Sequence, residues 1–178
     1  MKKVQVRDKE FALYLKEKQI QKAVDKLAGQ INKEMHGKVP LFLVVLNGAF
    51  VFASDLLKKI KLDCEISFVK LSSYAGTKST NTVRELIGLD RVLKDRTVVI
   101  LEDIIDSGIT MEYTRHKLKG LEAADVRIAT LLFKPDAFKK DYKIDYVGIE
   151  IPNDFIIGYG LDYDGFGRNL PDIYKIVD

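Results

Sequence analysis

The sequence is poor in the residues that build cross-linked or metal-rich proteins. It has a single cysteine, Cys64, no tryptophan and only two histidines in 178 residues. One thiol excludes an internal disulfide framework and a cysteine-rich zinc site, and two histidines argue against a histidine-rich metal centre. The longest apolar run, Leu41 to Leu46, is too short to cross a bilayer. The segment Met1 to Asp8 has no apolar signal core, so we expect a soluble, cytoplasmic protein.

The chain also lacks a strong excess of either charge. It has 29 Lys and Arg residues against 26 Asp and Glu residues, a formal net charge of +3. This excess is too small to indicate a nucleic-acid partner. The length suits one domain, and a hydrophobic content of 47% is enough for a substantial core. We therefore expect a single domain over residues 1–178 that binds neither nucleic acid nor membrane.

Apolar periodicity predicts alternating strands and helices. A helix is predicted over residues 10–36, because apolar residues recur there at steps of three and four: Ile20, Val24, Leu27, Ile31 and Met35. Two further helices are predicted over about 50–60 and 108–120. Strands are predicted at 41–46, 63–71, 98–101, 126–133 and 146–150. Residues 72–82 are small and polar, which favours a functional lid over a disordered loop, and the glycine-rich tail after residue 150 is expected to be irregular.

This alternation predicts an α/β fold with a central, mainly parallel sheet flanked by helices. In such sheets, ligands bind beyond the carboxyl ends of the strands. The loops that begin at residues 47, 72, 102, 134 and 151 are therefore the places to look for a site.

One segment, Val98 to Thr110, carries a chemical pattern. An apolar strand is followed by Glu102 and Asp103, then by Asp106, and then by small and hydroxyl residues that open a helix. The first N–H groups of a helix have no intrahelical partner and, with the helix dipole, form a cradle for phosphate. Carboxylates beside such a cradle would accept hydrogen bonds from sugar hydroxyls or meet a cation. A ribose 5′-phosphate has both matching groups, because its phosphate suits the cradle and its hydroxyls suit the carboxylates.

A simpler interpretation is that Asp106 and Ser107 only cap the helix, while Glu102 and Asp103 form a solvated strand end. The complete pattern, with a buried strand before it and a helix after it, favours the phosphate site. The segment has neither the Gly-Lys-Ser/Thr of a Walker loop nor the Gly-x-Gly-x-x-Gly of a dinucleotide fold.

Residues Val99 to Thr110 resemble the phosphoribosyl-pyrophosphate signature of the type I phosphoribosyltransferases. The stretch Glu102 to Gly108 is similar to the form found in the hypoxanthine-guanine phosphoribosyltransferases. The resemblance covers roughly residues 40–178. It includes Leu46 to Ala49 as a first pyrophosphate loop and Glu150 to Tyr163 as a purine-binding stretch. The purine-binding stretch narrows the resemblance from the superfamily to the members that act on 6-oxopurines.

The resemblance implies a role for each matched residue. Asp106 would be the general base near purine N7, Lys134 would donate to the purine 6-oxo group, and Phe155 would stack on the ring. The remaining substrate contacts would come from Asn47, Gly48, Ser73, Tyr74, Glu102, Asp103, Ser107, Gly108, Ile109, Thr110, Ile156, Asp162 and Arg168. Asn47 and Ile109 stand where other members have lysine, which leaves backbone contacts there. The Leu46–Asn47 peptide is a candidate for the cis form.

The same resemblance implies Mg²⁺ as cofactor, with Asp162 and Glu102 as its protein ligands. The substrates would be phosphoribosyl pyrophosphate and hypoxanthine or guanine, and the products IMP or GMP and pyrophosphate. It further implies a core over about 38–150, a small hood from about 1–37 and 151–178, and a homodimer or homotetramer.

Three alternatives differ in chemistry. A regulator with this fold could bind RNA or nucleotides, but it would need a broad basic face and could lose the carboxylate of Asp106, which is present here. A related transferase could act on xanthine, adenine or uracil, and the surroundings of Lys134 and Phe155 favour a 6-oxopurine without separating hypoxanthine, guanine and xanthine. A phosphate-binding domain without activity would leave the 72–82 segment and Arg168 unexplained.

Overall fold

A six-stranded sheet forms the centre of the molecule. The computed structural model describes residues 2–73, 83–87 and 91–177. The strand order is β5 (Val83–Ile87), β4 (Glu65–Ser73), β3 (Leu41–Leu46), β6 (Thr97–Ile105), β7 (Asp125–Phe133) and β8 (Tyr146–Glu150). All neighbours are parallel except β5, which runs antiparallel to β4. The predicted α/β fold with a mainly parallel sheet is confirmed.

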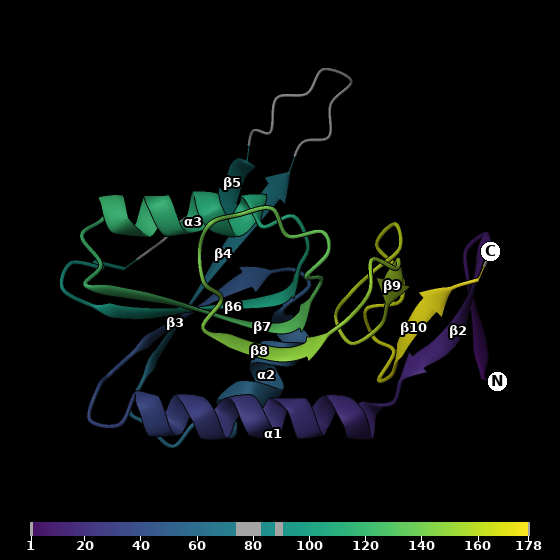
Figure 1. The fold of residues 1–178 in the computed structure, drawn as a ribbon, viewed down its shortest axis with the longest axis horizontal. Coiled ribbons are helices and arrows are strands. Elements are labelled where there is room, and N and C mark those ends of the chain that lie inside the picture. The colour runs from purple at the N-terminus through teal and green to yellow at the C-terminus, as the bar shows by residue number, and fades with distance from the viewer. Residues whose placement is uncertain (1, 74–82, 88–90, 178) are drawn as a thin grey trace.

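Helices cover both faces of this sheet (Figure 1). Helices α1 (Glu17–Glu34) and α2 (Phe50–Leu57) lie on one face, and α3 (Ile109–Gly120) lies on the other. Alternate residues of β3 divide between the two cores: Phe42 and Val44 pack with α1 and α2, whereas Leu41 and Leu43 pack with α3. Covering both faces explains why β3 is a continuous apolar run.

A second, smaller sheet joins segments from the two ends of the chain. Its order is β1 (Lys3–Val6), β2 (Lys9–Leu15), β10 (Ile173–Ile176) and β9 (Ile156–Ile157), with all pairs antiparallel. Both termini lie at this end of the molecule (Figure 1). Phe11, Ile157 and Tyr174 are almost fully buried and form the centre of its small core.

Two predictions about these segments were wrong. The helix expected from residue 10 begins at Glu17, because Lys9–Leu15 forms strand β2 instead. The tail expected to be irregular contains β9 and β10. Strand β2 pairs with its neighbour β1 and also with β10, and the pairing with β10 joins opposite ends of the sequence, so local periodicity does not reveal it. Helix α1 packs in the main core, so only residues up to Leu15 of the amino-terminal segment join the smaller sheet.

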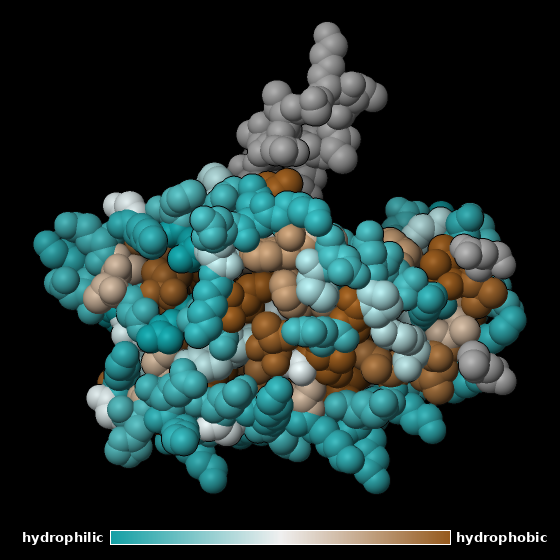
Figure 2. Space-filling model, viewed as in Figure 1, coloured by the Kyte–Doolittle hydropathy of each residue, from teal (hydrophilic) through white to brown (hydrophobic). Residues whose placement is uncertain are grey.

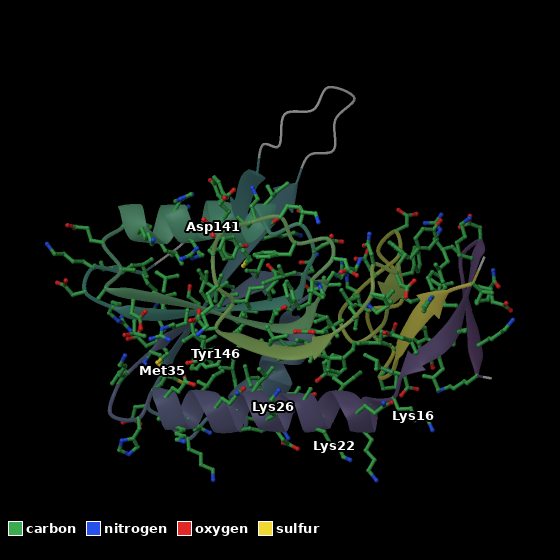
Figure 3. The ribbon with its side chains drawn as sticks, viewed as in Figure 1. Lys16, Lys22, Lys26, Met35, Asp141 and Tyr146 are labelled. Carbon is green, nitrogen blue, oxygen red and sulfur yellow. The ribbon has the colours of Figure 1, made fainter. Side chains whose placement is uncertain are left out.

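The outer face of α1 is charged. Figure 2 shows a mainly hydrophilic surface over this helix. Figure 3 shows Lys22 on its outer side and Tyr146 on its inner side, toward the sheet, where the Tyr146 hydroxyl donates to Glu34 over 3.0 Å. Among the described residues, no helix has the length and apolar character needed to cross a membrane.

Strand β6 continues further than the sequence indicated. It was predicted over 98–101 and runs to Ile105, so Glu102 and Asp103 belong to the strand itself. Strand β4 likewise continues through Ser73. Most of the predicted 72–82 lid, including Tyr74, lies outside the described residues.

Candidate functional site

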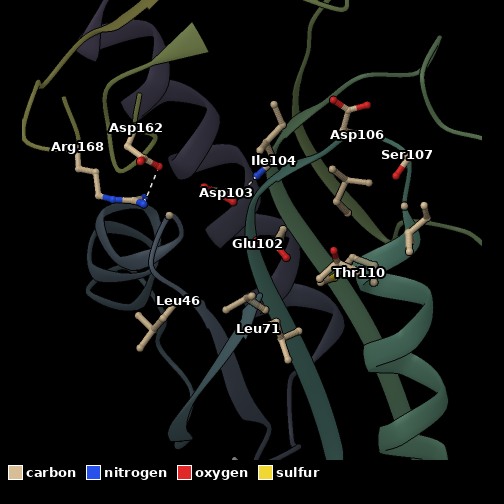
Figure 4. Close-up of a pocket in the computed structure, with 16 residues that line it drawn as sticks. Leu46, Leu71, Glu102, Asp103, Ile104, Asp106, Ser107, Thr110, Asp162 and Arg168 are labelled. Atoms are coloured by element: carbon tan, nitrogen blue, oxygen red, sulfur yellow. Dashed lines mark hydrogen bonds and ion pairs between the residues drawn. The ribbon is translucent and has the colours of Figure 1, made fainter. Parts of the chain in front are cut away.

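A pocket of about 540 Å³ opens where β3 and β6 end and α3 begins (Figure 4). Ten of the predicted site residues line it: Gly48, Glu102, Asp103, Asp106, Ser107, Gly108, Ile109, Thr110, Asp162 and Arg168. Apolar side chains complete its wall, among them Val45, Leu71 and Met111. The pocket lies at the carboxyl edge of the parallel sheet, where the fold predicts a ligand.

Four other predicted residues, all within the described part of the chain, are not among those that line this pocket. Lys134 and Ile156 are buried, while Asn47 and Phe155 are exposed. The Phe155 ring lies edge-on to that of Tyr163, with 6.0 Å between their centroids. Ser73 is at the end of β4, and Tyr74 lies beyond the described residues.

The start of α3 has the form of an anion cradle. Gly108 precedes the helix with a φ of +83°, a backbone conformation that favours glycine. A side chain at this position would also meet the Phe138 ring and the Tyr142 hydroxyl. The N–H groups of the first helical turn lack intrahelical partners and face the pocket end of α3, where a negative group is stabilised.

Two acidic side chains lie side by side on β6, just before the cradle. Glu102 is only 8% exposed. Burial and the neighbouring Asp103 carboxylate raise the pKa of Glu102 well above its ordinary value. Burial also raises the pKa of Asp103, although hydrogen bonds from Glu102 and from the Ile104 N–H (2.9 Å) oppose the shift. The pair is therefore a set of largely covered carboxyl oxygens that line the pocket, not a solvated strand end.

An ion pair forms another part of the pocket wall. The guanidinium of Arg168 lies 2.6 Å from Asp162 (Figure 4). It also donates to the Gly160 carbonyl over 2.7 Å. Asp162 also accepts the Gly165 N–H over 2.6 Å. Both side chains are mostly covered, with 27% and 28% exposure. Arg168 thus has a fixed position from which it can meet an anion entering the pocket.

The turn after β3 approaches the acidic pair very closely. A side chain on Gly48 would overlap the Asp103 carboxylate, and a side chain on Gly160 would overlap the Gly48 carbonyl. The Leu46–Asn47 peptide is cis, as the resemblance implied. The two glycines allow three separate segments to meet at one edge of the pocket.

Asp106 pairs with Lys134 across the end of the sheet. The Lys134 ammonium lies 3.0 Å from the Asp106 carboxylate, whose side chain is 52% exposed. The suggestion that Asp106 caps α3 was wrong, because the N-cap is Gly108 and no side chain forms a cap hydrogen bond. Asp106 is free to face the pocket while held by its lysine partner.

Sequence reasoning missed two contacts at this edge. Asn153 accepts a hydrogen bond from Lys134 over 3.3 Å. Tyr142 donates to the Gly108 carbonyl over 2.8 Å, and burial raises its pKa, so the hydroxyl stays protonated. Tyr142 lies in none of the recognised stretches of the sequence. Asn153 lies within the predicted purine-binding stretch, but nothing there indicated a contact with Lys134.

The acidic residues of the pocket suit a cation that takes only part of its ligands from protein. Within the described ranges, no cluster of three His, Cys, Asp or Glu residues is arranged to hold a metal. Yet Glu102, Asp103 and Asp162 line one pocket. Mg²⁺ usually keeps several waters and combines one or two carboxylates with substrate phosphates. The donor set therefore fits Mg²⁺ held jointly with a phosphorylated substrate.

Comparison with known families matches most of the chain. A family model described as phosphoribosyl transferase domain matches residues 13–164. The chain is 41% identical over 160 residues to the hypoxanthine-guanine phosphoribosyltransferase of Bacillus subtilis, covering 89% of each. It is 34% identical to the enzyme of the same name from Aquifex aeolicus, covering 98% of this chain and 99% of the relative.

Solved structures agree with these relatives. The crystal structure of a hypoxanthine phosphoribosyltransferase from Staphylococcus aureus superposes with a TM-score of 0.88 at 37% identity, covering 93% of this chain and 90% of that one. A hypoxanthine-guanine phosphoribosyltransferase from Bacillus anthracis gives a TM-score of 0.85 at 37% identity, covering 93% and 97%.

Proposed function

Because the chain belongs to the phosphoribosyltransferase family, as a transferase of the hypoxanthine-guanine group, we propose that it acts in purine salvage. It transfers the 5-phosphoribosyl group from phosphoribosyl pyrophosphate to hypoxanthine or guanine, giving IMP or GMP. A bond forms between a purine nitrogen and C1′ of the ribose while the bond from C1′ to pyrophosphate breaks. The proton displaced from the purine passes to a protein base.

The observation that carries the proposal is the anion cradle and the acidic pair in one pocket. The N–H groups at the start of α3, with the hydroxyls of Ser107 and Thr110, would hold the 5′-phosphate. Glu102 and Asp103 would accept hydrogen bonds from the ribose hydroxyls. Gly108 and Ile109 would contribute backbone groups only. A phosphate cradle together with acceptors for ribose hydroxyls is what a phosphoribosyl site needs, whereas a simple phosphate site needs the cradle alone.

The purine would lie at the end of the pocket marked by Asp106. Its carboxylate would take the proton from N7, a contribution of about 10²–10⁴ in rate for a well-placed base. Lys134 would donate to the 6-oxo group, so adenine, which presents a donor there, would be rejected. Phe155 would stack on the ring, and Ile156 would offer backbone groups to the purine edge.

The pyrophosphate would lie at the opposite end, near Arg168. Its guanidinium, held by Asp162 and Gly160, would form charge-assisted hydrogen bonds with the leaving group. Backbone groups of Asn47 and Gly48 would add to this contact, and Ser73 and Tyr74 would close over the reacting centre. Asp162 and Glu102 would hold Mg²⁺ together with the substrate. When bound, the ion would neutralise charge on the pyrophosphate.

The direct test is turnover. The protein is mixed with phosphoribosyl pyrophosphate, Mg²⁺ and one base at a time, and pyrophosphate release is followed. We expect release with hypoxanthine or guanine and none with adenine or uracil; the response to xanthine separates the 6-oxopurines. An absence of release with hypoxanthine, guanine and xanthine alike would reject the proposal, and turnover with adenine would reject the role of Lys134.

The wider expectations belong to the same proposal. We place the protein in the cytoplasm as one domain over residues 1–178, with the smaller sheet as a hood over the main sheet. We also propose a homodimer or homotetramer and no nucleic-acid partner. Light scattering of the purified protein tests the assembly, and a monomer at micromolar concentration would reject it.

A further inference from the structure

Lys134 is held in place at both its backbone and its side chain. Its N–H donates to the Ile105 carbonyl over 3.0 Å, and its own carbonyl accepts the Phe138 N–H over 3.2 Å. The residue is 8% exposed. A long, flexible side chain normally loses entropy when its position is fixed, so its contacts decide where the ammonium lies.

Two acceptors compete for that ammonium. The Lys134 Nζ atom lies 3.0 Å from Oδ2 of Asp106 and 3.3 Å from Oδ1 of Asn153. The two acceptors belong to different segments of the chain, one after β6 and the other after β8. An ammonium carries three hydrogens. Within the part of the chain that the structure describes, these contacts account for two of them, and the third is available to an acceptor on a ligand.

Asn153 is itself well positioned for this contact. The segment after β8 is anchored by the Ile151 N–H, which donates to the Phe133 carbonyl over 2.8 Å. On its other side, Asp154 pairs with Lys175 of β10 at 2.9 Å. The amide is therefore presented from a fixed backbone, although Asn153 itself is exposed.

The two acceptors differ in charge, because Asp106 is a carboxylate and Asn153 a neutral amide, and this difference affects where the Lys134 ammonium lies. A carboxylate attracts an ammonium more strongly than a neutral amide does. With Asp106 alone, the ammonium would move fully onto the carboxylate. The Asn153 oxygen draws it toward the other side without cancelling its charge, which leaves both the ammonium and the carboxylate available to a purine.

We propose that Asn153 is a positioning residue for purine recognition, holding the Lys134 ammonium where it meets the 6-oxo group. This rests on the proposed function, since it assumes that Lys134 reads the purine. Asn153 acts through Lys134 and need not touch the substrate. Its loss should weaken binding of nucleotides that carry a 6-oxo group and leave binding of those that lack it unchanged.

The experiment compares two ligands and two variants by calorimetric titration. One ligand is IMP, and the other is the purine ribonucleotide of the same structure without the 6-oxo group. Asn153→Leu keeps a similar volume and removes the acceptor. Asp154→Asn is the matched control, because it breaks the adjacent ion pair with Lys175 without removing the contact to Lys134.

We expect wild-type protein to bind IMP more tightly than the 6-deoxo nucleotide. Asn153→Leu should reduce this preference by about fivefold, as expected for one hydrogen bond, and Asp154→Asn should leave it unchanged. The KM for hypoxanthine should rise in Asn153→Leu while the KM for phosphoribosyl pyrophosphate stays constant. Circular dichroism of both variants confirms that they are folded.

Two outcomes overturn the inference. One is an unchanged preference for IMP in Asn153→Leu, and the other is an equal loss of affinity for both nucleotides, which would indicate general damage to the segment. Failure of the proposed function has a different signature: wild-type protein would then show no turnover, or no preference for IMP.

Discussion

The Tyr159 hydroxyl donates a hydrogen bond of 2.6 Å to the Asp55 carboxylate, and this contact joins the C-terminal loop to helix α2. Gln21 of α1 donates to the same carboxylate oxygen over 2.6 Å, and Lys58 pairs with the other at 2.8 Å. Tyr159 is almost fully buried. The loop that continues to Asp162 and Arg168 is therefore tied to both helices on one face of the main sheet.

Tyr159→Phe removes the hydrogen bond to the charged Asp55 carboxylate, together with the weaker one that the hydroxyl accepts from Gln21 over 3.2 Å, and leaves the ring in place. We expect the free energy of unfolding to fall by about 1.5–3 kcal/mol at neutral pH. Denaturant titration followed by circular dichroism measures it. Tyr113→Phe, at a side chain exposed on α3, is the control and should change stability little.

The same hydrogen bond should make stability depend on pH. Burial alone would raise the pKa of Asp55, but hydrogen bonds from Lys58, Tyr159 and Gln21 outweigh it and hold the pKa below its ordinary value. A lowered pKa stabilises the fold above the ordinary value, and this contribution is lost as the pH falls through the lowered one. The difference in stability between wild type and Tyr159→Phe should shrink from pH 7 to about pH 3. An equal difference at both would contradict this account.

Gly160→Ala should damage both the fold and the pocket. Gly160 has a φ of +101°, and a methyl group there would overlap the Gly48 carbonyl. We expect a loss of about 1–3 kcal/mol of stability and weaker binding of phosphoribosyl pyrophosphate. Gly29→Ala is the matched control: it lies within α1 with open space around it. That change should stabilise by about 0.5–1 kcal/mol. Similar effects of both substitutions would refute the steric argument.

Asp106→Asn tests the proposed base. The amide keeps the shape of the carboxylate and cannot take the purine proton. Turnover should fall by at least about 10², whereas IMP should still bind. Steady-state kinetics and a binding titration distinguish these two effects. Turnover at the wild-type rate would remove Asp106 from the mechanism.

Removal of divalent metal should stop the reaction. We expect chelation to abolish turnover and added Mg²⁺ to restore it. Asp162→Asn should raise the Mg²⁺ concentration needed for half-maximal rate several-fold, because the pocket loses one of its carboxylates. Asp164→Asn, whose carboxylate pairs with Arg7 outside the pocket, is the control. Full activity in the presence of chelator would argue against a metal requirement.

Local patterns in the sequence were enough to predict five of the six strands of the main sheet and the turn into helix α3, but not strand β5. The apolar run at Leu41–Leu46 and the strand-to-helix segment through Gly108 depend on neighbouring residues, and the structure places both as expected. Strand β2 was not predicted, because one of its two pairing partners, Ile173–Ile176, lies far away in the sequence. The contacts of Asn153 with Lys134 and of Tyr159 with Asp55 were missed for the same reason, since each joins residues far apart in the sequence.

The pairing of β2 with β10 also sets the order in which the protein can be assembled on the ribosome. Residues Lys9–Leu15 emerge before β10, which at about 5–20 residues per second follows on the order of ten seconds later. Until then the apolar side of β2, with Phe11 at its centre, lacks its cover. The nascent chain therefore exposes the apolar side of this strand until Ile173–Ile176 has been made, and translation speed or a bound chaperone should influence the yield of folded enzyme.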